Sequence, residues 1–89
     1  MTFLFKVELA FEILGRGCVI VPTVEGDFKI RPHDAIQLRT PGGHIRDTHT
    51  LSVEFLKPEV GMCRMGILLP TDIAKADVPT GTDVWLMQR

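Results

Sequence analysis

Residues 3–13 of the chain read FLFKVELAFEI, and every odd position in this stretch is apolar. The even positions include Lys6, Glu8 and Glu12, so charged side chains alternate with apolar ones. A period of two sustained over this length indicates a β-strand with one buried face. A helix would instead distribute the charges around its whole circumference. The stretch therefore predicts a long strand whose odd residues face a core.

Shorter apolar or alternating runs follow, separated by glycine and proline clusters such as 15–17 and 41–43. Residues 70–76 predict one or two helical turns, because Thr71 or Asp72 can cap a helix there. Six or seven short strands with so little helix predict an all-β fold, either a closed barrel or a small sandwich. The further strands are predicted at residues 18–21, 28–30, 35–40, 45–55, 62–69 and 82–87.

The length of 89 residues predicts one domain that covers residues 1–89. Hydrophobic residues make up 45 % of the chain, which is typical of a globular protein. The net charge is −1, whereas a general electrostatic nucleic-acid binder needs a clear excess of lysine and arginine. The composition therefore disfavours that class of function.

The two cysteines, Cys18 and Cys63, have neither CxxC spacing nor a paired histidine, and we interpret them as small apolar residues in a reducing compartment. Lys6, Glu8 and Glu12 interrupt any secretory signal at the beginning of the chain. No apolar run approaches the length of a membrane span. These observations predict a cytoplasmic protein without a membrane segment.

Residues 11–20, FEILGRGCVI, resemble the F-x-I-x-G-R-G-x-V-V segment that opens the second, β-barrel domain of translational GTPases of the elongation factor Tu type. The likeness continues in order along nearly the whole chain. Lys29-Ile30 with Asp34 and Ile36 is similar to the K-V-G-D-x-V strand of that domain. The later segments with counterparts in the family are Ser52-Val53-Glu54-Phe55, Gly66-Ile67-Leu68-Leu69 and the residues from Asp77 to Val84.

The resemblance implies a small closed barrel of six antiparallel strands that contacts tRNA and the ribosome. It places ligand or RNA contacts at Glu8, Glu54 and Leu69, with Arg16 supporting the turn. Pro70 stands where the family has an arginine, which removes a cation suited to the RNA end. The chain has no G-x-x-x-x-G-K-[ST] loop, so no nucleotide is expected to bind to it alone.

The residues themselves also fit simpler, structural explanations than these binding roles. Glu8 and Glu54 also fit the outward, solvated positions of their strands, and we favour that interpretation. Arg16 between two glycines fits a structural role in which it bonds back to loop carbonyls. Arg31, Arg39, Arg46 and Arg64 would form a basic patch if they converged, although aspartates lie near them in the sequence.

Metal binding and catalysis find little support in the sequence. His44 and His49 have opposite parity on one predicted strand, His33 lies apart, and no spacing supplies three or four zinc ligands. No nucleophile, base and orienting group can be assembled, so a non-enzymatic protein without a cofactor is predicted.

Trp85 alternates with Val84 and Leu86 and is therefore predicted to face outward, as an interface residue. Two functions follow. One is a binding module for RNA, a ribosomal component or a protein. The other is a structural module that forms a homo-oligomer, or part of a larger complex, through Trp85 or the edge near Pro22.

Overall fold

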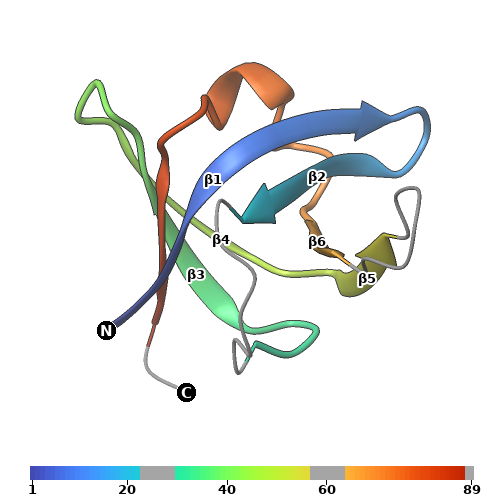
Figure 1. Ribbon diagram of the computed structural model, residues 1–89, viewed down its shortest axis with the longest axis horizontal. Coiled ribbons are helices and arrows are strands. Elements are labelled where there is room, and N and C mark those ends of the chain that lie inside the picture. Colours follow the sequence, from blue (N-terminus) through green and yellow to red (C-terminus); the bar gives the residue numbers. More distant parts are fainter. Residues whose placement is uncertain (23–29, 57–63, 88–89) are drawn as a thin grey trace.

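The computed structural model describes residues 1–22, 30–56 and 64–87 and confirms an all-β fold. All strand pairs are antiparallel, and the strands form one sheet in the order β4-β3-β7-β1-β2-β6-β5 (Figure 1). The predicted strand 28–30 and Cys63 fall outside the described residues, apart from Ile30. The elements are β1 (Thr2–Ile13), β2 (Gly17–Pro22), β3 (Ala35–Arg39), β4 (Ile45–His49), β5 (Ser52–Leu56), β6 (Arg64–Leu68), the 3-10 turn η1 (Lys75–Asp77) and β7 (Asp83–Leu86).

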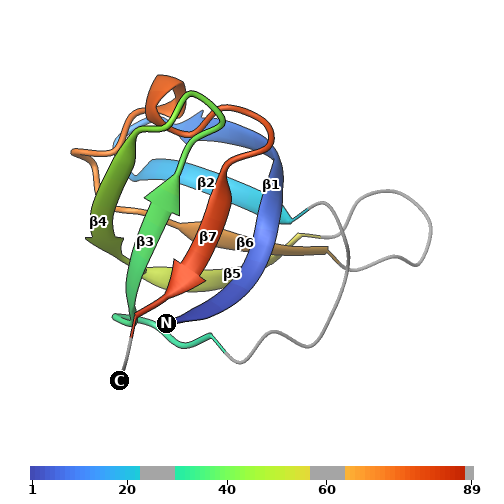
Figure 2. The same cartoon turned by 90° about the vertical axis from the view of Figure 1, so that its left-hand side faces the viewer.

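Strand β1 belongs to both halves of the sheet. Its first residues pair with β7 and its later residues pair with β2. The register shifts between Phe3 and Phe5 and again between Val7 and Leu9, which marks two bulges. Bulges bend a strand and increase its twist. Figure 2 shows the result, with β4, β3, β7 and β1 side by side and β2, β6 and β5 crossing behind them.

The bulges correct the prediction that every odd residue of β1 is buried. Phe5 and Val7 are buried as expected, but Phe3 is 45 % exposed and Leu9 is 41 % exposed. Beyond the second bulge the buried position passes to an even residue, Ala10. An extra residue in one strand turns all later side chains to the other face, and a strict alternation cannot predict it.

The predicted closed barrel of six strands is also corrected. The described residues form seven strands in an open sheet, with β4 and β5 at its two edges. Residues 45–55, predicted as one strand, are divided into β4 and β5 by Thr50 and Leu51. Strand β5 continues the path of β4 around a corner, so these two edge strands do not form a hairpin. No hydrogen-bonded ladder between them is described.

Thr50 fixes this corner with buried hydrogen bonds. Its hydroxyl donates to the carbonyl of Arg31 at 2.6 Å and accepts from the backbone N–H of Asp34 at 3.1 Å. On the other side, the N–H of Leu51 donates to the carbonyl of Leu68 at 2.9 Å. The corner is thereby tied to the segment before β3 and to the end of β6. A fully buried hydroxyl is stable here because it is satisfied.

The core lies between the two halves of the sheet. Ile73 and Val78 cover one end of it, from the segment that follows β6 and contains η1. The helical turn predicted at 70–76 is the 3-10 turn η1, slightly later in the chain. Among the described residues, no helix is long and apolar enough to cross a membrane. The other large core residues are Phe5, Val7, Ile20, Ile36, Leu38, Ile67, Leu69 and Val84.

The hairpin between β1 and β2 has two glycines with positive φ, and their surroundings differ. At Gly17, with φ of 130°, an added Cβ would overlap the backbone carbonyl oxygen of Leu69. At Gly15, with φ of 80°, an added Cβ would meet no atom within 4 Å. The second glycine of the G-R-G turn is therefore required for close packing of β2 on the segment after β6, besides its backbone conformation.

Replacing these glycines by alanine is expected to separate the two effects. Gly15→Ala adds backbone strain, which costs about 1–2 kcal/mol, whereas Gly17→Ala adds that strain and a clash with rigid backbone. Chemical denaturation of both variants measures the free energy of unfolding. Gly17→Ala should lose clearly more stability than Gly15→Ala, and equal losses would contradict the close approach at Gly17.

Candidate functional site

The outward side of β4, β3, β7 and β1 carries a cluster that contains the tryptophan. Phe3 of β1 lies opposite Trp85 of β7, and their rings meet edge to face with centroids 5.3 Å apart. The guanidinium of Arg39 lies 4.6 Å from the centroid of the Trp85 ring. We call this surface the aromatic face and define it by Phe3, Gln37, Arg39, Ile45, Asp47 and Trp85.

A chain of hydrogen bonds holds Arg39 in place on the ring. The Nε of Arg39 donates to Oε1 of Gln37 at 2.7 Å, and Nε2 of Gln37 donates to Oδ1 of Asp47 at 2.9 Å. Gln37 thus orients the guanidinium from one side while Trp85 supports its plane. A cation stacked on tryptophan is stabilised by about 0.5–1 kcal/mol at exposed sites. These contacts fix the position of the guanidinium on the face.

The charges on the aromatic face are not mutually neutralised. Lys6 beside the face donates to Asp83 at 2.6 Å, so that pair is satisfied. Arg39, by contrast, forms no ion pair with a carboxylate among the described residues, and Asp47 forms none with a basic side chain. The face therefore presents one cation and one anion that are held apart.

The apolar part of the face is open to solvent. Ile45 is 64 % exposed, although in one continuous strand over residues 45–55 it would share the buried face with Leu51 and Val53. Trp85 is half-buried under Phe3 and Arg39, and its Nε1 has no acceptor among the described residues. Val84 beside it is fully buried, so Trp85 lies on the outward side as the alternation predicted. Exposed aromatic and aliphatic groups around an arginine are typical of interface centres.

The residues suggested by the family resemblance have different surroundings in the structure, and two of them, Arg16 and Glu54, are bonded to each other. Glu54 accepts from Nη2 of Arg16 at 2.7 Å and from the hydroxyl of Ser52 at 3.1 Å. The Arg16 side chain therefore bonds to a carboxylate, whereas the sequence had predicted bonds to loop carbonyls. Leu69 is fully buried in the core, so its side chain is not presented on the surface. Glu8 is exposed, and its carbonyl accepts from the hydroxyl of Thr80.

The four arginines of the predicted basic patch do not share one face. Arg39 points outward, whereas Arg46 pairs with the buried Leu38 and lies on the inward side of β4. Arg46 is held by Asp72 at 3.1 Å and lies 3.8 Å from Asp77. Arg31 is exposed in the turn before β3, and the side chain of Arg64 lies outside the described part.

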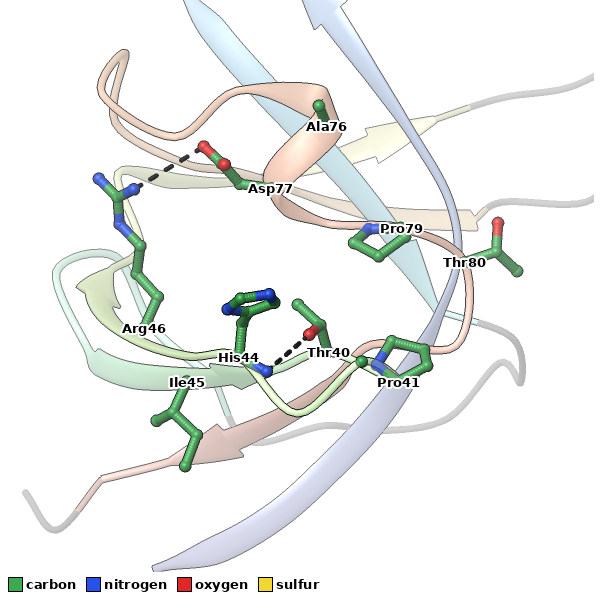
Figure 3. A pocket seen from close by; sticks show the side chains of 10 residues that line it. Thr40, Pro41, His44, Ile45, Arg46, Ala76, Asp77, Pro79 and Thr80 are labelled. Carbon is green, nitrogen blue, oxygen red and sulfur yellow. Dashed lines mark hydrogen bonds and ion pairs between the residues drawn. The ribbon is translucent and has the colours of Figure 1, made fainter.

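A second candidate is the hollow between the β3–β4 hairpin and the segment that contains η1, with a volume of about 750 Å³ (Figure 3). Arg46 and Asp77 approach each other across one end of it, and Pro41 and Pro79 line the other end. Its backbone is tied by the bond from the N–H of His44 to the hydroxyl of Thr40. Both ionic groups are already engaged with each other, so the hollow has little charge to offer a ligand.

The described residues contain no candidate metal site. No group of three or more histidine, cysteine, aspartate or glutamate side chains is close enough there to hold an ion. His44 lies in the hairpin after β3, whereas His33 and His49 lie at the opposite end of that strand. His33 adopts a positive φ of 68° in the turn before β3, where its N–H donates to the carbonyl of Thr50.

Cys18 is a free thiol in the core. Burial raises the pKa of the Cys18 thiol, and the negative charges of Glu12 and Asp77 raise it further. The reactive form of cysteine is the thiolate, so the buried thiol is a poor nucleophile. Because the folded state holds this proton more tightly than the unfolded chain, the thiol lowers stability as the pH rises above the unfolded pKa.

A variant with Cys63→Ser isolates this thiol. Under native conditions at pH 7 to 9, Cys18 should react with a thiol reagent far more slowly than it does in denaturant. Absorbance of the released chromophore measures both rates, and the denatured sample is the control. Rapid native labelling of this variant would contradict the buried, protonated thiol.

Comparisons with protein-family models, with curated proteins and with solved structures found no match to the chain. The function is therefore inferred from the geometry of the chain itself. Sequence reasoning identified Trp85 and Arg39 separately but did not place them together, and it placed Phe3 in the core. The bulge after Phe3 leaves no local signal in the alternating pattern that would have revealed its exposure.

Proposed function

We propose that this protein is a non-enzymatic binding module whose partner is a protein, and that the aromatic face is its binding surface. The observation that carries the proposal is the Arg39 guanidinium stacked on Trp85 beside the exposed Phe3. Tryptophan, aromatic neighbours and arginine are the residue types that most often dominate binding energy. Their fixed geometry lowers the entropy lost when a partner binds.

The distribution of charge favours a protein partner over RNA. Arg16 and Arg46 are both bonded to carboxylates, and a phosphate would have to displace these acids. Arg39 points away from Arg46, so the two do not form a continuous basic surface. RNA binding that depends on phosphate contacts needs several cations along one path.

The family resemblance remains a proposal beside this one. It is supported by the G-R-G turn between β1 and β2, where Gly17 packs against the backbone at Leu69. The antiparallel pairing of short strands also fits that family, although the described strands form an open sheet and not its closed barrel. A cytoplasmic location also stays a prediction from the sequence. Under this proposal the chain retains the scaffold of such a domain and binds through a different surface.

A photo-crosslinking amino acid at position 3 tests the binding surface. Introduced in place of Phe3, it should yield a covalent adduct of defined mass in cells that produce the protein at its normal level. Mass spectrometry identifies the partner, and the purified partner should then bind wild-type protein more tightly than a Trp85→Ser variant.

The matched control carries the same amino acid in place of Leu14, which is a fully exposed apolar residue at the β1–β2 hairpin. Leu14 lies outside the aromatic face and should give no such adduct. Equal adducts from both positions, or none from position 3, would overturn the proposed surface.

The RNA alternative has its own test. Wild-type protein should show no measurable affinity for tRNA or ribosomal RNA fragments at low ionic strength, because its described arginines do not form a continuous basic surface. Filter binding over a series of salt concentrations measures this. Tight binding that weakens steeply with salt, and that Arg31→Gln reduces, would favour RNA as the partner.

A further inference from the structure

The aromatic face is complementary to itself. Its residues form two rows across the four strands, because the strand register places the members of each row directly opposite their neighbours on the adjacent strands. Strands are about 4.8 Å apart and successive residues on one face are about 6.8 Å apart. One row contains Phe3, Trp85, Gln37 and Asp47, and the next contains Lys6, Asp83, Arg39 and Ile45.

A diagonal drawn across these rows from Ile45 on β4 to Trp85 on β7 divides the two unneutralised charges. Arg39 and Asp47 lie on opposite sides of this diagonal. With ideal strand spacing, the two residues lie at about the same distance along it. A two-fold axis along the diagonal would therefore exchange the two charges. It would bring Arg39 of each copy against Asp47 of the other.

The same axis accounts for the apolar residues. Ile45 and Trp85 lie on it, so each would pack against its own counterpart, as residues on the axis of an isologous interface must. Phe3 extends the apolar contact on one side. A near-neutral chain with net charge −1 also brings little repulsion to a pair of copies.

We infer that the partner of the aromatic face is a second copy of this chain, in a two-fold dimer with reciprocal Arg39–Asp47 ion pairs. This inference rests on the proposed function, since it names the partner of the same surface. A standard interface takes about 800 Å² from each partner, and the whole chain exposes 5480 Å². The contact would thus cover a substantial part of the four-stranded half of the sheet.

Analytical ultracentrifugation over a range of concentrations tests the inference with charge exchange. Arg39→Glu alone places a new carboxylate against Asp47, and Asp47→Arg alone places a new guanidinium against Arg39. Each variant alone should dimerise about 10- to 100-fold more weakly than wild type, because like charges are then juxtaposed. An equimolar mixture of the two variants should regain a dissociation constant near the wild-type value, since every pair is again complementary.

Two further variants keep the test decisive if Arg39→Glu does not fold. Ile45→Glu changes an exposed residue and places two carboxylates on the proposed axis, so it should abolish the dimer while leaving the circular dichroism spectrum unchanged. Leu14→Glu, the matched control at the distant hairpin, should leave the dimer intact.

The outcomes separate this inference from the proposed function. A wild-type monomer at all concentrations, or a dimer insensitive to Ile45→Glu and not restored by mixing, overturns the second copy as partner. The proposed function survives that result if the crosslinker at position 3 still captures a different protein. If the protein forms no dimer and the crosslinker gives no adduct, both the inference and the proposed function are overturned.

Discussion

The bent strand β1 is the constraint on which the rest of the structure depends. Its two bulges allow one strand to pair with β7 at its beginning and with β2 later, so a single sheet covers both sides of the core. Phe5 and Val7 lie between the bulges and are buried where the two halves meet. Without that bend, residues of β2 and β6 could not reach those of β3 and β7. The Thr50 corner makes the complementary turn at the opposite edges.

The bend also creates the aromatic face, which is the proposed binding surface. The register shift between Phe3 and Phe5 gives the two phenylalanines opposite directions, one toward Trp85 and one into the core. A small chain that must bury most of its apolar residues nonetheless keeps an aromatic ring outside. Because Arg39 is held from two sides, by Trp85 and by Gln37, the surface around this ring has little freedom to lose.

The sequence allowed the strands to be predicted more successfully than the directions of their side chains. Alternation located β1, β3 and β7 closely, since a period of two is a local property of the chain. It failed at Phe3 and Ile45, because a bulge and a corner change which face is buried without changing the pattern. It also missed the division of residues 45–55, where a buried threonine bonds to a segment far away in sequence.

The candidate site was harder to predict because its contacts join distant residues. Parity alone indicated that Trp85 faces outward, but its neighbours depend on which strands lie beside β7. Arg39 and Phe3 reach it from two different strands, and the partner of Arg16 is Glu54, which is 38 positions away. Such pairings follow from the order of strands in the sheet, which a single sequence with local patterns does not specify.

Small size would give self-association a thermodynamic role. A domain of this length buries about 60–65 % of the surface that its unfolded chain would expose, so each further area removed from water matters. A second copy on the aromatic face would bind the folded state and not the unfolded chain, and stability would then rise with protein concentration. The edge strand β4 supplies Ile45 and Asp47 to this face, and the same contact would cover part of an edge that is otherwise open to unwanted pairing. In that arrangement the open sheet, which closure into a barrel would have protected, is partly protected by its own copy.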